Sequence, residues 1–288
     1  MPLRQQERFI VTEIGTSTPE FSVRVPGDGG GLVRLAWAAK TDVGHRRAAN
    51  EDSYVAQSPV FAVADGMGGH SAGDLASAAV VRRLAEGSTG DFIATEVVDS
   101  ALENATDDID VVSVDSVKGV GTTATGAVLT MLDGSPYFAV FNIGDSRVYA
   151  FEDGALHQVT TDHSVVQEMV DAGMITRDQA DVHPDSNIIT RAVGFGAPPS
   201  PDYWMLPLEA GFRLLVCSDG LTKELGDDEL LAHLALRLTA SETVDALVFA
   251  ALAAGGRDNV TAIVVDVIEA PINPDHKLRA PRSGADGV

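Results

Sequence analysis

The hydrophobic positions along this chain fall into many short runs, most with the length and the β-branched or aromatic content of strands. The runs are 33–38, 60–64, 124–132, 137–143, 147–151, 213–218 and 261–268. Asp133-Gly134 and Asp153-Gly154 lie between neighbouring runs, and Asp-Gly is typical of the two-residue turn of a β-hairpin. The pattern therefore predicts antiparallel strand pairs.

Apolar residues at helical spacing predict helices over 73–86, 92–107, 162–172, 227–238 and 241–254. Gly87 and Gly173 stand where C-terminal caps belong, and Asp227 and Ser241 suit N-caps. The hairpins and helices occur in separate runs and do not alternate strictly. We therefore expect an α+β fold with antiparallel sheets and helices packed outside them, not a doubly wound parallel sheet.

These elements form one block, 33–268, without an internal linker or repeat. Residues 1–32 mix charges with Ser, Thr and Pro, so we expect a loosely ordered N-terminal extension with one strand around 21–25. Residues 269–288 contain prolines and charges without periodicity, and they predict a disordered tail.

Composition narrows the range of functions. Hydrophobic residues make up 45% and charged residues 22%, which is ordinary for a globular core, and the formal net charge of −22 argues against a nucleic-acid or anionic-membrane surface. No run reaches the roughly 18 apolar residues of a membrane span, and no signal peptide is visible. We therefore expect a cytoplasmic protein. The single cysteine, Cys217, lies in an apolar run and predicts a buried side chain, not a nucleophile.

Acidic residues recur at the ends of the predicted strands. Asp65, Asp145 and Asp219 each follow an apolar run and adjoin a small or turn-forming residue, and Asp258 directly precedes the last run. Each alone could be a solvated turn residue. Together they indicate bound cations, because crowded carboxylates repel one another unless cations bind among them. Oxygen ligands without clustered His or Cys favour hard ions such as Mg²⁺ or Mn²⁺, and two such ions can activate water for attack on a phosphoester.

Two further segments carry candidate chemistry. Asp65 is followed by the glycine-rich segment 66–69, which we interpret as a turn that lets ligands approach, and then by His70. Upstream, Arg47 could hold a phosphate through its planar guanidinium while Glu51 and Asp52 reach the waters of a metal ion. A charged surface loop explains that upstream segment equally well.

Six motifs in this order are similar to those of the metal-dependent protein phosphatases of type 2C, the PPM family, in their bacterial form. They are Arg47…Asn50-Glu51-Asp52, Ala64-Asp65-Gly66-Met67-Gly68-Gly69-His70, Gly121-Thr122-Thr123, Gly144-Asp145-Ser146-Arg147, Ser218-Asp219-Gly220-Leu221-Thr222 and Arg257-Asp258-Asn259. The resemblance spans 33–268. It implies a central β-sandwich of two antiparallel sheets flanked by helix pairs, in four layers.

The resemblance also implies a centre with two Mn²⁺ or Mg²⁺ ions at one end of the sandwich. Asp65 would bridge the two ions, and the Gly66 carbonyl would bind one of them. Asp219 and Asp258 would ligate the other ion. Glu51 matches the acid that holds the second ion directly or through water, with Asp52 close behind it.

Three other residues match functional positions of the family. Arg47 matches its phosphate-binding arginine, and Asp145 matches a ligand of a weaker third ion. His70 matches the proposed general acid, although a structural role for this histidine stays open. At one position the chain departs from the pattern: Lys223 stands where the family places an acid at the third ion. A cation there should weaken that ion, with Glu224 as an alternative ligand.

The resemblance implies a phosphoserine/phosphothreonine protein phosphatase in which activated water attacks the phosphomonoester directly, without a covalent intermediate. Its partners would be phosphoproteins, the substrates of bacterial Ser/Thr kinases, and we expect a monomer. Two alternatives stay open: a signalling module that binds partners without turnover, and hydrolysis of a different phosphomonoester.

Overall fold

The computed structural model describes residues 11–27, 30–68, 72–113, 119–195 and 198–271. One sheet contains β1 (Glu13–Gly15), β4 (Asp52–Gln57), β5 (Val60–Gly68), β6 (Val120–Thr122), β7 (Ala124–Leu132), β8 (Ser135–Ile143), β11 (Val193–Gly194) and β12 (Asp202–Pro207). The other contains β2 (Thr18–Arg24), β3 (Leu32–Asp42), β9 (Arg147–Glu152), β10 (Ala155–Gln158), β13 (Arg213–Cys217) and β14 (Val260–Glu269).

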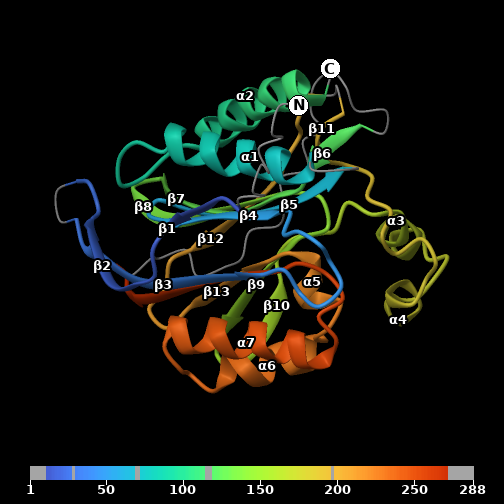
Figure 1. Ribbon diagram of the computed structural model, residues 1–288. Coiled ribbons are helices and arrows are strands. Elements are labelled where there is room, and N and C mark those ends of the chain that lie inside the picture. Colours follow the sequence, from blue (N-terminus) through green and yellow to red (C-terminus); the bar gives the residue numbers. More distant parts are fainter. Residues whose placement is uncertain (1–10, 28–29, 69–71, 114–118, 196–197, 272–288) are drawn as a thin grey trace, which may run out of the picture.

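The two sheets face each other, and helices cover their outer faces (Figure 1). The first sheet has the order β1-β4-β5-β7-β8-β12, with β6 beside β5 and β11 beside β6, and the second has the order β10-β9-β13-β14-β3-β2. The helices are α1 (Gly73–Gly87), α2 (Thr95–Ser113), α3 (Val165–Asp171), α4 (Arg177–Asp181), α5 (Asp219–Thr222), α6 (Asp227–Ala235) and α7 (Ala240–Ala254). Helices α1 and α2 lie on the first sheet and α6 and α7 on the second, while α3 and α4 project from one end. The predicted four-layer α+β sandwich is confirmed.

The first sheet differs from the prediction at its edge, because β1 runs parallel to β4. The sheet is therefore mixed, while every pair in the second sheet is antiparallel. Sequence reasoning missed this pair because β1 is short and comes from the segment that we expected to be loosely ordered. The second strand from that segment, β2, pairs with β3 and includes most of the strand expected around 21–25. Residues 1–10 and 272–288 lie outside the described residues.

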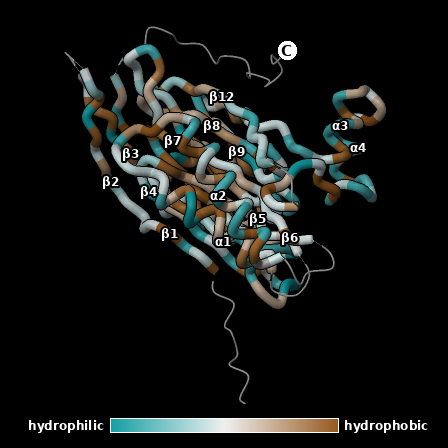
Figure 2. The backbone as a smooth tube through the Cα atoms, turned by 90° about the horizontal axis from the view of Figure 1, so that it is seen from above, coloured by the Kyte–Doolittle hydropathy of each residue, from teal (hydrophilic) through white to brown (hydrophobic). Residues whose placement is uncertain are grey.

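The continuous apolar run of β5 reflects burial on both faces of its sheet. Phe61 and Val63 point into the core between the two sheets, while Ala62 and Ala64 point into the core under α1 and α2. Aromatic contacts cross the inter-sheet core, with the rings of Trp37 and Phe61 5.2 Å apart in an edge-to-face arrangement. Figure 2 shows the hydrophobic residues gathered along the strands in the middle of the molecule.

Of the turns and helix caps predicted from the sequence, some are confirmed and others are wrong. Both Asp-Gly turns are confirmed, since Asp133, Gly134, Asp153 and Gly154 all have positive φ, as this hairpin turn requires. The predicted N-caps are wrong by one or two residues: Gly226 caps α6, and the hydroxyl of Thr239 caps α7. No helix in the described parts of the chain is long and apolar enough to cross a membrane.

Candidate metal and phosphate site

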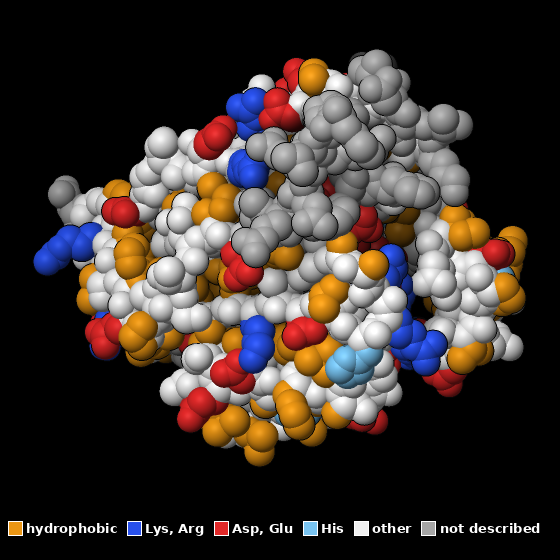
Figure 3. Space-filling model, in the orientation of Figure 1, with side chains coloured by type: hydrophobic (Ala, Val, Ile, Leu, Met, Phe, Trp, Pro, Cys, Tyr) orange, Lys and Arg blue, Asp and Glu red, His pale blue; other side chains and the backbone are white. Residues whose placement is uncertain are grey.

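The acidic residues singled out in the sequence, apart from Asp52, meet in one cavity of about 1220 Å³ at an end of the sandwich. Its lining includes Arg47, Glu51, Asp65, Gly66, Asp145, Lys223, Asp219 and Asp258, and residues of α3 and α4 form another part of the wall. On the face shown in Figure 3, Lys and Arg side chains gather at the end of the sheets near α3 and α4. The fold thus joins residues from six separate segments of the chain.

Asp65 lies within a strand and not at its end, so the turn expected over 66–69 is wrong as far as Gly68, and Gly69 lies outside the described residues. Strand β5 continues to Gly68, with Asp65 opposite Asp52 of β4. The Asp65 backbone N–H donates to the Thr123 hydroxyl at 2.9 Å, and the Thr122 hydroxyl donates to the Asp65 carbonyl at 2.9 Å. The glycines indicated a turn, but pairing with β4 and β6 on either side holds this segment extended. The carboxylate is therefore presented from a rigid backbone.

Gly66 is required by close packing of the backbone. A Cβ at this position would lie 2.1 Å from the Gly73 carbonyl oxygen and 2.6 Å from the Glu51 carbonyl oxygen. These contacts come from the first turn of α1 and from the residue before β4. Any side chain would push both away from Asp65, which explains the need for glycine here.

Asp52 lies beneath the cavity and does not line it. Its side chain is buried, and its Oδ2 accepts hydrogen bonds from Ser218 Oγ at 2.8 Å and Thr261 Oγ1 at 2.6 Å. Its other oxygen, Oδ1, has no hydrogen-bond partner among the described residues. Burial, only partly offset by these hydrogen bonds and reinforced by the charge of Asp219, raises its pKa to about 7. Sequence reasoning gave neither hydroxyl a role, because nothing in the sequence shows that strands β13 and β14 pass behind β4.

Burial and neighbouring charges also disfavour the ionised form of the other carboxyl groups in the cavity. Burial, and then the charges of Asp52 and Asp219, raise the pKa of Asp65 well above its ordinary value. Burial and the charge of Asp219 raise the pKa of Asp145 to about 8, although Lys223 opposes the shift. Burial likewise raises the pKa of Glu51, against the opposing charge of Arg47. Such a cluster resists ionisation unless cations neutralise it.

Two side-chain cations already lie among these carboxylates. Arg47 bonds Asp258 through Nε at 2.7 Å and through Nη2 at 2.8 Å. The Lys223 ammonium contacts Asp219 and lies 3.5 Å from Asp258. Burial tends to lower the pKa of Lys223, but Asp219 and then Asp258 more than offset this effect, so its pKa is raised.

The donor set suits a hard divalent ion, since it is made of carboxylate and carbonyl oxygens. One oxygen of Asp219, Oδ1, is buried and has no hydrogen-bond partner among the described residues, as an unfilled ligand would be. However, no group of three or more His, Cys, Asp or Glu side chains among the described residues is arranged to hold an ion as it stands. The carboxylates converge, but Arg47 and Lys223 take oxygens that an ion would need.

Glu224, which we expected as an alternative ligand, does not line the cavity. Its carboxylate is buried against Arg257, which donates from Nε at 2.9 Å and from its backbone N–H at 2.8 Å. Burial raises the pKa of Glu224, but the bonds from Arg257 outweigh it and the pKa is lowered. The sequence places Glu224 next to Lys223, but this ion pair directs it away from the cavity.

Two residues to which the sequence assigned no site role hold the loops of the cavity. Asn259 accepts a hydrogen bond from the Glu51 backbone at 2.9 Å and donates to the carbonyls of Val43 and Ala49. His163 accepts a hydrogen bond from the Gly144 backbone N–H at 3.2 Å, beside Asp145. The Asn259 position within the Arg-Asp-Asn motif is the only sequence signal for its role. His70 lies outside the described residues.

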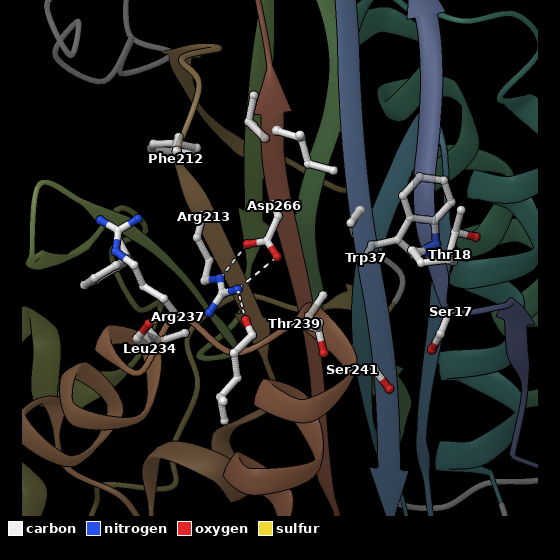
Figure 4. Close-up of a pocket in the computed structure, with 18 residues that line it drawn as sticks. Ser17, Thr18, Trp37, Phe212, Arg213, Leu234, Arg237, Thr239, Ser241 and Asp266 are labelled. Atoms are coloured by element: carbon white, nitrogen blue, oxygen red, sulfur yellow. Dashed lines mark hydrogen bonds and ion pairs between the residues drawn. The ribbon is translucent and has the colours of Figure 1, made fainter.

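A second cavity, of about 710 Å³, lies at the opposite ends of β13 and β14 (Figure 4). Arg213 and Asp266 form an ion pair in its wall. All three guanidinium nitrogens of Arg213 are bonded within the protein, with Thr243 and the Leu238 carbonyl among the acceptors. This pair therefore stabilises the sheet and leaves no free donor for a ligand.

Comparisons with known proteins agree with this geometry. The sequence matches the family Protein phosphatase 2C over residues 44–253. It is 39% identical over 241 residues to the serine/threonine protein phosphatase PstP of Mycobacterium tuberculosis, covering 82% of this chain and 45% of the relative. The chain thus spans about half the length of that relative. It is 33% identical to the serine/threonine phosphatase stp of Listeria innocua, covering 79% of this chain and 94% of the relative.

Solved structures show the same fold. A crystal structure of the M. tuberculosis phosphatase PstP/Ppp superimposes with a TM-score of 0.74 at 37% identity, covering 83% of this chain and all of that chain. The PstP catalytic domain in complex with two manganese ions gives a TM-score of 0.73, also at 37% identity. The family match includes Glu51, Asp65, Asp145 and Asp219 of the cavity and ends before Asp258. The chain belongs to the protein phosphatase 2C family.

Proposed function

We propose that this chain is a phosphoserine/phosphothreonine protein phosphatase that depends on Mn²⁺ or Mg²⁺. The observation that carries the proposal is the convergence of Asp65, Asp219 and Asp258 with Arg47 in one cavity, in a member of the protein phosphatase 2C family. Support comes from the related PstP catalytic domain, which was solved with two manganese ions.

Each candidate ligand has a distinct role. Asp65 would be shared by both ions, with the Gly66 carbonyl on one of them, and Asp219 and Asp258 would hold the other. Glu51 would bind directly or through water, and Asp52 would support Asp65 from below. When bound, two such ions would supply an activated water and neutralise charge on the phosphoryl oxygens. Asp145 is the candidate ligand for a weaker third ion.

The chain's own residues would position the phosphate and move the proton. The Arg47 side chain is 49% exposed, so its guanidinium can turn from Asp258 to a substrate phosphate and stabilise charge on the equatorial oxygens. His70 would protonate the leaving alkoxide of serine or threonine. Water would attack phosphorus directly. In agreement, the one cysteine cannot serve as nucleophile, since Cys217 is buried and burial raises the pKa of its thiol to about 12.

The proposals on the source of the substrates, the location of the protein and its oligomeric state rest on the sequence alone. We propose that the substrates are phosphoproteins made by bacterial Ser/Thr kinases, and that the protein acts as a cytoplasmic monomer. The chemistry proposed for the cavity does not depend on these statements.

The decisive experiment is a phosphopeptide assay with controlled metal. We expect purified protein to release phosphate from a phosphothreonine peptide in Mn²⁺, and to stop when EDTA is in excess. Turnover that persists in EDTA would contradict the metal-dependent mechanism. No turnover with Mn²⁺ or Mg²⁺, despite metal binding, would favour a module that binds partners without catalysis.

A further inference from the structure

Lys223 is placed beside the site by the backbone on both sides of it. Helix α5 is a single turn that begins at Asp219, so Lys223 follows at i+4 on the same face as that carboxylate. The backbone N–H of Lys223 donates to the Asp219 carbonyl at 2.8 Å. The contact between the ammonium and Asp219 is therefore favoured by the local helical turn, whether or not an ion is bound.

A second connection directs Lys223 toward Asp258. Arg257 donates to the Lys223 carbonyl at 2.7 Å, and it is ion-paired with Glu224, whose side chain is only 2% exposed. This joins the residues after α5 to the residues before β14. The ammonium then lies 3.5 Å from Asp258 as well as in contact with Asp219. Its side chain is 33% exposed, so the charge can reach water if it is displaced.

The contacts account for nearly every oxygen that these two carboxylates could offer to an ion. Asp258 Oδ1 is on Arg47 and its Oδ2 is shared by Arg47 and Lys223. Asp219 Oδ2 is on Lys223, and only Asp219 Oδ1 has no partner among the described residues. A divalent ion that binds both carboxylates must therefore take oxygens from the ammonium.

We propose that Lys223 is a tethered cation that neutralises Asp219 and Asp258 in the metal-free protein, so that binding of the divalent ion displaces its ammonium. This rests on the proposed function, in which the same carboxylates hold an ion. Lys223 lowers the affinity for that ion, because the ion must displace the ammonium. The net gain is the attraction of the carboxylates for the ion minus their attraction for the ammonium. Lys223 also stabilises the metal-free fold, because it separates carboxylates that would otherwise repel. Its effect thus reaches the two-ion core and is not confined to a third ion.

The test compares Lys223→Met with Lys223→Arg and Lys40→Met. Methionine keeps the aliphatic stem and removes the charge, while arginine keeps the charge. Lys40→Met is the matched control, since it changes the net charge equally but removes a lysine that is paired with the exposed Asp245 on α7. Mn²⁺ affinity is measured by titration calorimetry and by the electron paramagnetic resonance signal of free Mn²⁺, and the Tm is measured in EDTA.

We expect Lys223→Met to bind Mn²⁺ at least about tenfold more tightly than wild type, because a full positive charge is removed within a few ångströms of the ion. The Tm of Lys223→Met in EDTA should fall below that of Lys40→Met. In Mn²⁺ the two variants should have the same Tm. Lys223→Arg and Lys40→Met should bind Mn²⁺ within about threefold of wild type.

Three results would overturn this assignment, and they separate it from the proposed function. Equal Mn²⁺ affinity in all four proteins would show that Lys223 does not compete with the ion, although the metal centre itself would stand. A raised KM for phosphopeptide with unchanged Mn²⁺ affinity would make Lys223 a substrate contact instead. Failure of all four proteins to bind Mn²⁺ would remove the metal centre and the proposed function together.

Discussion

At the scale of single residues, the site is dominated by carboxyl groups that the fold holds close together without room for all their charges. Asp65 is the extreme case, with its pKa raised by burial and by the charges of Asp52, Asp219, Asp145 and Asp258. Two opposite consequences follow for one substitution. In the proposed function the carboxylate is shared by the ions, and the same carboxylate destabilises the metal-free protein.

We therefore expect Asp65→Asn to abolish turnover while raising the free energy of unfolding in EDTA, by about 1–3 kcal/mol. Phosphopeptide turnover and urea unfolding in EDTA measure the two effects. Asp153→Asn in the β9–β10 hairpin is the control, since that residue has a positive φ that Asn accepts. Near-normal turnover in Asp65→Asn would rule out its shared role.

The Arg47 guanidinium provides a second test at the residue scale. Its two bonds to Asp258 use the planar fork that also matches a phosphate, and a lysine cannot reproduce that geometry. We expect Arg47→Lys to raise KM for a phosphothreonine peptide by about tenfold or more, with kcat less affected. Mn²⁺ affinity should stay close to wild type. An unchanged KM would show that Arg47 serves only as a partner of Asp258.

At the scale of elements, the site depends on how closely β5, β4 and α1 approach one another. Gly66→Ala should force the Gly73 and Glu51 carbonyls apart, because its Cβ would lie 2.1 Å and 2.6 Å from them. We expect a loss of about 2–4 kcal/mol in the free energy of unfolding and a large loss of Mn²⁺ affinity. Gly87→Ala at the end of α1, where the nearest atom is 3.4 Å away, should leave both unchanged. Equal behaviour of the two variants would contradict the packing argument.

The N-terminal strands provide another element-scale test. Trp37 donates from its indole N–H to the Thr16 carbonyl at 3.0 Å, and its ring lies 5.4 Å from that of Phe21. We expect removal of residues 1–24 to lower the Tm and to shift tryptophan fluorescence to longer wavelength, because both β1 and β2 are lost. Removal of residues 1–10 is the control. If the longer truncation matched the control, residues 11–24 would be the loose extension that the sequence predicted.

At the scale of the whole molecule, the carboxyl cluster links stability to pH and to metal. Asp52 and Asp145 have pKa values raised from 3.8 to about 7 and about 8. Between about pH 4 and pH 8 the folded metal-free protein therefore keeps protons that the unfolded chain has released, so its stability falls as the pH rises. Below this range both states are protonated, and above it the loss is complete.

We expect the Tm in EDTA to be several degrees lower at pH 8 than at pH 5.5, with a smaller or reversed difference in Mn²⁺, since ions bind the ionised carboxylates. Thermal unfolding at matched ionic strength measures both curves. Asp145→Asn should make the Tm in EDTA less dependent on pH. The pH dependence of the Tm in Mn²⁺ should change less. Identical pH dependence with and without metal would show that the net charge of −22, and not the cluster, controls the stability.

The sequence by itself determined most of the secondary structure and indicated most of the acidic residues that line the cavity. Runs such as 60–64 and 213–218 predicted strands because their periodicity and composition are local, and the Asp-Gly turns predicted hairpins for the same reason. The order of six motifs indicated the family, and the family comparison agrees. These signals can be recognised without knowledge of tertiary contacts, because each lies within a few neighbouring residues.

Only the tertiary structure decided how these residues act on one another. It placed Asp65 inside β5 through pairing with β4 and β6, and it placed Asp52 behind the cavity on the hydroxyls of Ser218 and Thr261. It also directed Glu224 to Arg257 and left Lys223 among the carboxylates. The physical reason is that burial and charge depend on distances between segments far apart in the chain. A sequence shows which charges exist, but their separation decides whether they repel, pair or hold an ion.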